Sequence, residues 1–226
     1  WLLILGANVN GFSLKVNEEQ KLFNDLFIKN KQNLQKLLGK LNNYEGDIND
    51  FNKLKKFVEN VKPDIVFHLA AEPLVIDSYK NPLKTWNTNV IGSLNLLESL
   101  KNIDNLCSAI FITTDKVYKN KEWLYGYREN DELSGRDPYS ASKAAMEIAI
   151  SSFRDSFCGS SKYQNKNLLI STARAGNVIG GGDWAKDRLI PDIVRSLFLK
   201  RTILLRNPKA IRPWQHVLDP LYGYMC

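Results

Sequence analysis

The sequence predicts an α/β protein in which helices wind around both sides of a parallel sheet. Nearly continuous apolar runs at residues 64–71, 109–114 and 168–173 are typical of strands covered on both faces. Apolar residues at helical spacing lie between these runs, over residues 86–100 and 137–157. Strands that alternate with helices form βαβ units, which build an open, doubly wound sheet.

Shorter signals predict the remaining elements in order. Residues 9–14 read as a strand, and the leucine spacing in the Asn- and Lys-rich stretch 17–43 predicts a helix. A helix over residues 47–60 would open on Asp or Asn caps and close before Pro63. A further helix is predicted around residues 190–199.

The composition indicates a globular protein. The 226 residues are 44% hydrophobic, enough for one large domain. No stretch reaches the roughly 20 apolar residues of a membrane helix, and the apolar run Trp1–Leu5 is too short for a complete secretory signal. Three distant cysteines predict neither disulfides nor a metal site and favour the cytoplasm. The net charge of +7 comes from scattered lysines, which favours an anionic small molecule over nucleic acid.

Polar residues follow each of the three buried runs, where ligands bind in open α/β sheets. They are His68–Glu72, Thr113–Lys116 and Arg174–Asn177. Thr114, Asp115 and Lys116 supply a hydroxyl to bind a sugar oxygen, an acid to protonate a leaving hydroxyl, and an amine to remove an acidified proton. The alternative is an ordinary turn with Lys116 in solvent.

The helix after this strand carries a second pair of reactive groups. Asp137 and Pro138 are typical of its cap and first position, and we expect it to run to about Phe157. Tyr139 and Lys143, four residues apart, share one face of it. We expect the ammonium group to lower the pKa of Tyr139, which could then take a proton from a sugar hydroxyl as hydride leaves the same carbon. On its own, a Tyr-Lys pair at this spacing is often an ordinary pair of helix residues with no catalytic role.

Together, these motifs resemble the extended short-chain dehydrogenases/reductases, the family of NAD-dependent epimerases and dehydratases. Within it, the chain is similar to the dehydratases that act on CDP-glucose, and Lys116 stands where the enzymes for dTDP-glucose have Glu. The matching segments span nearly the whole chain: His68–Ala71, Thr88–Val90, Thr114–Lys116, Asp137–Lys143, Ala173–Trp184, Asp187–Asp192 and Arg212–His216. The block around Gly180–Asp183 is far more specific than the Tyr-Lys pair.

The resemblance implies a Rossmann-like dinucleotide-binding domain over residues 1–178 and a small substrate lobe over 179–226. It implies conversion of CDP-glucose to its 4-keto-6-deoxy product, for surface polysaccharide or deoxysugar synthesis. Tyr139, steered by Lys143, would deprotonate the C4 hydroxyl, and Thr114 would hold the C4 oxygen. Asp115 would protonate the leaving C6 hydroxyl, and Lys116 is the expected C5 base.

The resemblance also implies which residues bind the ligands. NAD would contact Asp47, Ile48, Leu69, Ala70, Ala71, Asn89, Thr113, Tyr139 and Lys143. Lys15 replaces the acid expected to bind the adenosine ribose, which leaves NADP open. The nucleotide sugar would contact Asn177, Arg188, Arg206 and Arg212, since guanidinium groups suit a pyrophosphate. The helices at 86–100 and 139–157 would pair in a homodimer.

Two alternatives stay open: a dehydratase or 4-epimerase for a different nucleotide sugar, and a non-catalytic dinucleotide-binding protein. The chain starts at Trp1 inside an apolar segment and stops at Cys226 without a polar tail, so we expect a fragment. A first strand and Gly-rich turn would be missing, with that strand between residues 9–14 and 64–70. Residues 1–226 alone should then aggregate or partly unfold and fail to bind NAD.

Overall fold

The structure is a computed structural model that describes residues 1–15 and 41–226. Its strands form three sheets in which every pairing is parallel. One sheet pairs β1 (Val9–Ser13) with β2 (Leu41–Glu45). The central sheet has the order β3 (Ile65–His68), β4 (Cys107–Thr114), β5 (Leu168–Ala175). The third pairs β6 (Asn177–Ile179) with β7 (Trp214–His216).

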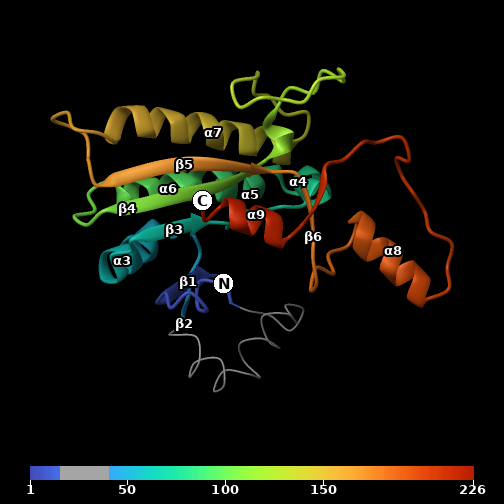
Figure 1. Cartoon of the computed structure of the whole chain (residues 1–226), viewed down its shortest axis with the longest axis horizontal. Helices are drawn as coiled ribbons and strands as arrows, with labels where there is room; N and C mark the ends of the chain where they lie inside the picture. The colour runs from blue at the N-terminus through green and yellow to red at the C-terminus, as the bar shows by residue number, and fades with distance from the viewer. Residues whose placement is uncertain (16–40) are drawn as a thin grey trace.

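Helices connect these strands, which confirms the α/β class. In chain order they are α3 (Phe51–Val61), α4 (Val75–Lys80), α5 (Pro82–Trp86), the π-helix η2 (Asn87–Ile91), α6 (Gly92–Leu100), the 3₁₀ turn η3 (Asp115–Val117), α7 (Pro138–Phe157), α8 (Leu189–Phe198) and α9 (Leu218–Gly223). The helix α7 runs along β5 and packs on β4 and β5, while α3 packs on α6 (Figure 1).

The core lies where α6 and α7 pack around the central sheet. Its largest fully buried side chains are Phe111, Leu97, Leu100, Met146, Ile150 and Leu168. Burial of such side chains stabilises the fold by about 1.5–3 kcal/mol each. Because β4 is the middle strand, Cys107, Ala109 and Phe111 are all inaccessible to solvent. These three residues alternate along the strand and point to one face, whereas Ile65 and Leu169, which flank Ser108 on the other face, are 57% and 53% exposed. In the described residues one face of the sheet is therefore fully covered and the other only in part, unlike the cover on both faces that the apolar runs predicted.

The predicted start of α7 is confirmed in detail. Asp137 has extended backbone angles, and its Oδ1 accepts a hydrogen bond from the Ser140 N–H at 2.9 Å. Its Oδ2 accepts from the Ser140 hydroxyl at 2.6 Å. Pro138 occupies the first helical position, where its missing N–H has no cost. The cap thus fixes the turn of helix that carries Tyr139.

Two predicted helices differ from the structure. Most of the helix predicted over residues 17–43 lies outside the described residues, but Leu41–Asn43 belong to β2. There, parallel hydrogen bonds to β1 outweigh the leucine spacing. The helix predicted from residue 47 begins at Phe51, because Asp47 accepts a hydrogen bond from the Asn49 N–H at 2.9 Å and closes a turn.

The region between β3 and β4 is less regular than predicted. The strand predicted over 64–71 is confined to Ile65–His68. The helix predicted over 86–100 contains the five-residue π-helix η2 before α6 begins at Gly92. Single π turns inside helices are rare and often occur at functional sites. This one places Asn89 in the interior, with none of its surface exposed.

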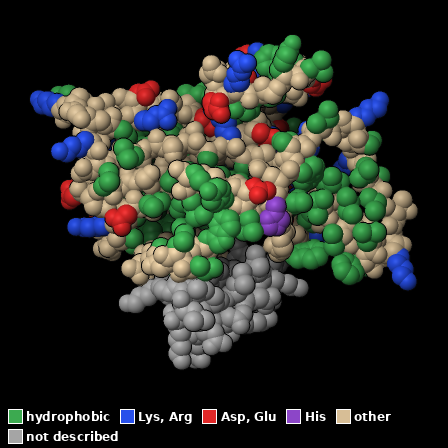
Figure 2. All heavy atoms as spheres, viewed as in Figure 1, with side chains coloured by type: hydrophobic (Ala, Val, Ile, Leu, Met, Phe, Trp, Pro, Cys, Tyr) green, Lys and Arg blue, Asp and Glu red, His purple; other side chains and the backbone are tan. Residues whose placement is uncertain are grey.

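After β6 the segment that carries α8 extends away from the central sheet, and the chain returns at β7, which pairs with β6 (Figure 1). Figure 2 shows hydrophobic side chains gathered over the part of the surface where α8 lies. Leu197, Phe198 and Leu204 are 63%, 80% and 81% exposed. Over the ranges that the structure describes, no helix is long and apolar enough to cross a membrane.

Candidate active site

The predicted reactive groups meet where β4 ends. Thr114 is buried, and its hydroxyl donates to Asp115 Oδ1 at 3.1 Å. The Lys116 N–H donates to Thr114 Oγ1 at 3.4 Å, which closes the turn η3. The exposed Lys116 side chain returns toward α7, with its Nζ 5.8 Å from the centre of the Tyr139 ring. The hydroxyl of Thr114, the carboxyl of Asp115, the amine of Lys116 and the phenol of Tyr139 therefore lie near one another at the end of β4.

Lys143 lies one helical turn after Tyr139, and both residues are buried on α7. Lys143 Nζ donates to the Ile112 carbonyl of β4 at 3.0 Å and lies 3.6 Å from Met146 Sδ. Burial lowers the pKa of Lys143 to about 8, while the Glu147 carboxylate acts in the opposite direction. At neutral pH the ammonium form therefore prevails and is held against the central sheet.

The ionisation of Tyr139 corrects one expectation. Burial raises the pKa of this phenol, and the Thr114 hydroxyl and the Arg188 charge only partly oppose that effect. The prediction that Lys143 lowers the pKa of Tyr139 is therefore wrong for this structure. The physical reason is that Tyr139 is 9% exposed, while the Lys143 ammonium group is directed to the Ile112 carbonyl.

A buried polar network fixes the backbone of Tyr139. Asn89 Oδ1 accepts from the Glu72 N–H at 2.8 Å, and Asn89 Nδ2 donates to Ser142 Oγ at 2.9 Å. The Ser142 hydroxyl donates in turn to the Tyr139 carbonyl at 2.7 Å. On the other side, the Tyr139 N–H donates to Ser78 Oγ at 3.2 Å. Side chains from η2, α4 and α7 thus hold both backbone groups of Tyr139.

Removing this network should weaken the fold measurably. We expect Asn89→Ala to lower the free energy of unfolding by about 1–3 kcal/mol, because the part-buried Glu72 N–H loses its acceptor and the buried Ser142 oxygen loses its donor. Denaturant unfolding of the full-length protein would measure the change. The exposed Asn102 provides the control, and Asn102→Ala should change stability by less than about 0.5 kcal/mol. Equal stability of the two variants would contradict this role of Asn89.

His68 ends β3 in the same interior. Its Nε2 lies 2.9 Å from Ser93 Oγ, and the Ser93 hydroxyl donates to the Asn89 carbonyl at 2.7 Å. Nε2 must then carry the proton and donate to Ser93. Burial, and secondly the charge of Lys143, lower the pKa of His68 to about 3. His68 is therefore a neutral structural group at physiological pH.

The residues predicted to bind the dinucleotide divide into two sets. Asp47, Leu69 and Ala70 are exposed, with Leu69 and Ala70 directly after β3, and Ala71 is half-buried beside them. The side chains of Ile48, Asn89 and Thr113 are instead buried in the interior, where they contact other parts of the protein. Ile48 packs so closely on Gly92 that a Cβ there would lie 2.7 Å from it. Thr113 donates to the buried Glu147 carboxylate. Lys15 is exposed beyond β1.

The predicted substrate residues lie beyond β5. Arg188 pairs with Asp183 at 3.0 Å, and its charge acts on Tyr139. Arg206 pairs with Asp187 at 2.7 Å and with Asp192 at 3.3 Å. Arg212 donates to the neighbouring Ile211 carbonyl at 2.8 Å, and its side chain is exposed. Of these arginines, Arg188 is the one whose charge lowers the pKa of the Tyr139 phenol, although burial has the larger, opposite effect.

Asn177 differs from the arginines because it is already desolvated. Its Oδ1 is buried, and none of the described residues donates a hydrogen bond to it. Its N–H donates to the Pro213 carbonyl at 3.1 Å, which fixes the start of β6. A buried acceptor of this kind suits a ligand that brings a hydroxyl or amino group.

Sequence reasoning missed one buried ion pair next to these residues. Glu147 of α7 and Arg174 of β5 form a two-point contact at 2.8 and 3.0 Å. The available signal was spacing: Glu147 follows Lys143 by four residues, as Lys143 follows Tyr139, so all three share one face of the helix.

The chain matches a family model described as GDP-mannose 4,6 dehydratase over residues 3–225. A CDP-glucose 4,6-dehydratase of Salmonella typhimurium is 47% identical over 225 residues, which cover 100% of this chain and 60% of that protein. A UDP-glucose 4-epimerase of Mycoplasma genitalium is 30% identical over 218 residues, 92% of this chain and 62% of that protein. The chain thus spans about three fifths of the length of these curated relatives.

Solved structures share the fold at low sequence identity. The UDP-glucose 4-epimerase of Thermotoga maritima, solved with UDP-glucose, superposes with a TM-score of 0.74 at 21% identity, covering 96% of this chain and 72% of that one. A dTDP-glucose 4,6-dehydratase double mutant from Streptomyces venezuelae, solved with NAD bound, gives 0.74 at 21% identity, covering 95% and 70%. These likenesses confirm the predicted doubly wound α/β fold.

Proposed function

The chain belongs to the GDP-mannose 4,6-dehydratase family of extended short-chain dehydrogenases/reductases, and from this premise we propose that the whole protein removes water from CDP-glucose. The product would be CDP-4-keto-6-deoxy-glucose. The observation that carries the proposal is the placement of Thr114, Asp115 and Lys116 around the ring of Tyr139. The 47% identity to a CDP-glucose 4,6-dehydratase supports the choice of nucleotide.

The residues present fit a nicotinamide dinucleotide. Leu69, Ala70 and Ala71 offer small or exposed groups and free backbone just beyond β3, where a dinucleotide lies in this fold. Lys143 has three N–H donors, and the described residues supply one carbonyl acceptor and one distant sulfur. A donor therefore remains for a ribose hydroxyl. When bound, NAD would accept hydride from the sugar C4 and return it to C6, and exposed Lys15 leaves NADP as a possible substitute.

The side chains would divide the proton transfers among themselves. Tyr139 would take the C4 hydroxyl proton, and Thr114 would hold the C4 oxygen. The Thr114 hydroxyl and the charge of Arg188 would favour the phenolate form that Tyr139 needs for this step, against the effect of burial. Once C4 is a ketone, Lys116 would remove the acidified C5 proton, and Asp115 would protonate the departing C6 hydroxyl. With hydride returned to C6, Lys116 would give its proton back to C5, and passage of the proton from Tyr139 to Asp115 would restore the starting state. The net change is the loss of one water molecule from the sugar.

The nucleotide part would lie toward the residues after β5. Arg188, Arg206 and Arg212 would bind the pyrophosphate, and the buried Asn177 Oδ1 would accept a hydrogen bond from the sugar nucleotide. We propose a division between a dinucleotide-binding domain at residues 1–178 and a substrate lobe at 179–226, which places the junction within β6.

The protein would be a cytoplasmic homodimer acting in surface polysaccharide or deoxysugar synthesis. Ile91 and Ile148, 48% and 60% exposed, support pairing through η2 and α7.

A substrate panel tests the proposal. The full-length protein would be mixed with NAD and with CDP-, dTDP-, UDP- or GDP-linked sugars, and the keto-sugar followed by its absorbance in alkali. We expect turnover with CDP-glucose and no net consumption of NAD. A clear preference for dTDP-glucose would contradict the nucleotide assignment. Isomerised sugar without loss of water would favour a 4-epimerase, and no turnover with any substrate would favour a non-catalytic dinucleotide-binding protein.

A further inference from the structure

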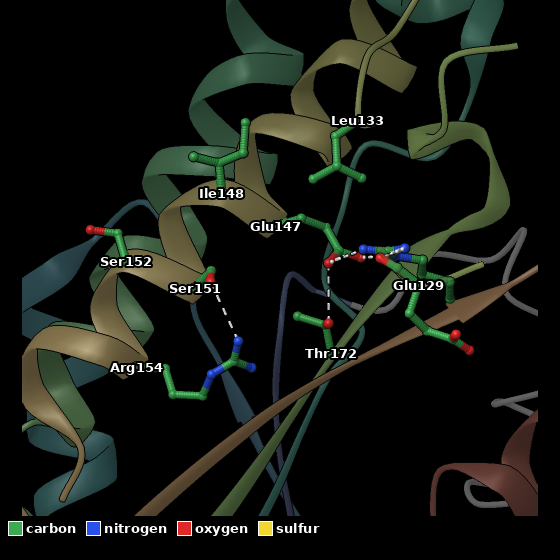
Figure 3. Close-up of a pocket in the computed structure, with 9 residues that line it drawn as sticks. Glu129, Leu133, Glu147, Ile148, Ser151, Ser152, Arg154 and Thr172 are labelled. Atoms are coloured by element: carbon green, nitrogen blue, oxygen red, sulfur yellow. Dashed lines mark hydrogen bonds and ion pairs between the residues drawn. The ribbon is translucent and has the colours of Figure 1, made fainter. Parts of the chain in front are cut away.

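Glu147 is a buried carboxylate that accepts four hydrogen bonds from three residues on two strands, β4 and β5. Its side chain is 5% exposed. Arg174 Nε and Nη2 donate to its two oxygens at 2.8 and 3.0 Å. The Thr113 hydroxyl of β4 donates to Oε1, and the Thr172 hydroxyl of β5 donates to Oε2 at 3.1 Å. Figure 3 shows Glu147 reaching down from α7 to meet Thr172 on the strand below. Every lone-pair direction of the carboxylate is therefore used.

Arg174 extends this contact to the segment that follows η3. Its Nη1 donates to the Glu129 carbonyl at 3.0 Å, and its guanidinium carbon lies 4.8 Å from the centre of the Tyr118 ring. Tyr118 in turn stacks on Tyr127 with ring centres 5.0 Å apart. The Glu147–Arg174 pair thus joins α7, the strands β4 and β5, and the chain just beyond the proposed catalytic residues.

The pair also sets the electrostatic surroundings of Lys143. Burial alone raises the pKa of Glu147, but hydrogen bonds from Arg174 and Thr113 outweigh it and hold that pKa below its ordinary value. The charged and titratable groups around Lys143 are Tyr139 and Glu147 on α7, His68 on β3, and Arg174 on β5 behind the Glu147 carboxylate. His68 is neutral, so Glu147 is the one carboxylate of the described chain whose charge supports the ammonium group.

The contacts of Glu147 and Lys143 lie on β4 directly before the proposed catalytic residues Thr114 and Asp115. Thr113 directly precedes Thr114 and Asp115, and Lys143 binds the carbonyl of Ile112 on the same strand. A carboxylate that fixes Thr113 therefore also fixes the distance between α7 and the end of β4. We infer that Glu147, clamped by Arg174, is a positioning residue that holds Lys143 against β4 and supplies the charge that keeps its ammonium group in place. This inference rests on the proposed function, in which Lys143 donates a hydrogen bond to the ribose of the dinucleotide.

The test compares charge-changing variants of opposite sign in the full-length protein. Glu147→Gln keeps the side-chain shape but removes the negative charge, so the titration of Lys143 should move to lower pH. The expected shift is roughly 0.5 to 2 pH units, the effect of a unit charge about 6 Å away at effective dielectric constants of about 80 to 20. Arg174→Gln leaves the carboxylate uncompensated and should move the same titration to higher pH. General loosening of the fold would move both titrations in one direction.

The readout is the ¹³Cε signal of Lys143 in lysine-labelled protein, assigned with Lys143→Arg, together with the pH profile of kcat. Thr172→Val is the matched control, because it removes one hydrogen bond and no charge and should leave the titration within about 0.3 pH units. Arg174→Lys preserves both charges and covers the case in which the other variants do not fold. It should lower kcat through lost two-point geometry while the titration stays in place.

The outcomes separate this inference from the proposed function. If the wild-type protein turns over no nucleotide sugar, the proposed function fails, and the Lys143 titration still decides the role of Glu147. If Glu147→Gln and Arg174→Gln leave that titration unchanged, or shift it in the same direction, the inference is overturned.

Discussion

Replacing Tyr139 by phenylalanine in the full-length protein is expected to reduce kcat with CDP-glucose by a factor of about 10²–10⁴, the usual contribution of a general base. Phenylalanine retains the buried ring and the hydrogen bonds of the backbone N–H and carbonyl, and it loses the hydrogen bond between the phenol and Thr114. The fold should therefore persist while the group that removes the C4 proton is lost. Stopped-flow measurement of nicotinamide reduction would show whether the first oxidation is the step that slows.

A matched control is available on α4. Tyr79 is 65% exposed and lies outside the proposed site, so Tyr79→Phe should keep kcat within about twofold. Thermal unfolding of both variants should resemble that of the wild type. Normal turnover by Tyr139→Phe would show that a different group takes the C4 proton.

Asp115→Asn is expected to give a comparable loss of turnover at a different step. An amide can accept the hydrogen bond from the Thr114 hydroxyl but cannot protonate the departing C6 oxygen. The first oxidation should then proceed while the loss of water slows by about 10²–10⁴. Enzyme-bound reduced nicotinamide should therefore accumulate, which its absorbance and fluorescence would report in a single turnover.

The two variants are informative as a pair, because Tyr139→Phe should give no reduced nicotinamide and Asp115→Asn should give an excess. Asp104→Asn, at an exposed position after α6, provides the control and should behave as the wild type. Nearly normal turnover by Asp115→Asn without build-up of reduced nicotinamide would mean that Asp115 is not the acid.

Local sequence signals predicted the elements that form the frame of the site. The buried strands at β3, β4 and β5 were visible as apolar runs, and the Asp137 cap with Pro138 placed the start of α7. These signals work because a strand packed against helices needs apolar side chains, and the unpaired N–H groups of a first helical turn need a capping acceptor nearby. They also placed Tyr139 and Lys143 on one buried face of α7.

Other features depended on partners that are distant in the sequence. The leucine spacing in the stretch 17–43 suggested a helix, yet residues 41–45 pair with β1 as a strand. The π turn at Asn89 forms where its amide can bond Glu72 and Ser142, 17 and 53 residues away. No local pattern encodes such contacts, because the free energy that selects them comes from satisfying buried polar groups across the fold.

The sequence by itself therefore determined the α/β class, the alternation of strands and helices, and the identity of the groups that gather beyond the strands. The tertiary structure alone decided their chemical state. Burial raises the pKa of Tyr139 where spacing predicted a lowered one, and the Ile112 carbonyl and the Glu147 carboxylate determine where the Lys143 ammonium group lies and how it ionises. Residue spacing sets which side chains share a face, but an ionisation equilibrium depends on desolvation and on charges brought in from other elements, which only the packed fold supplies.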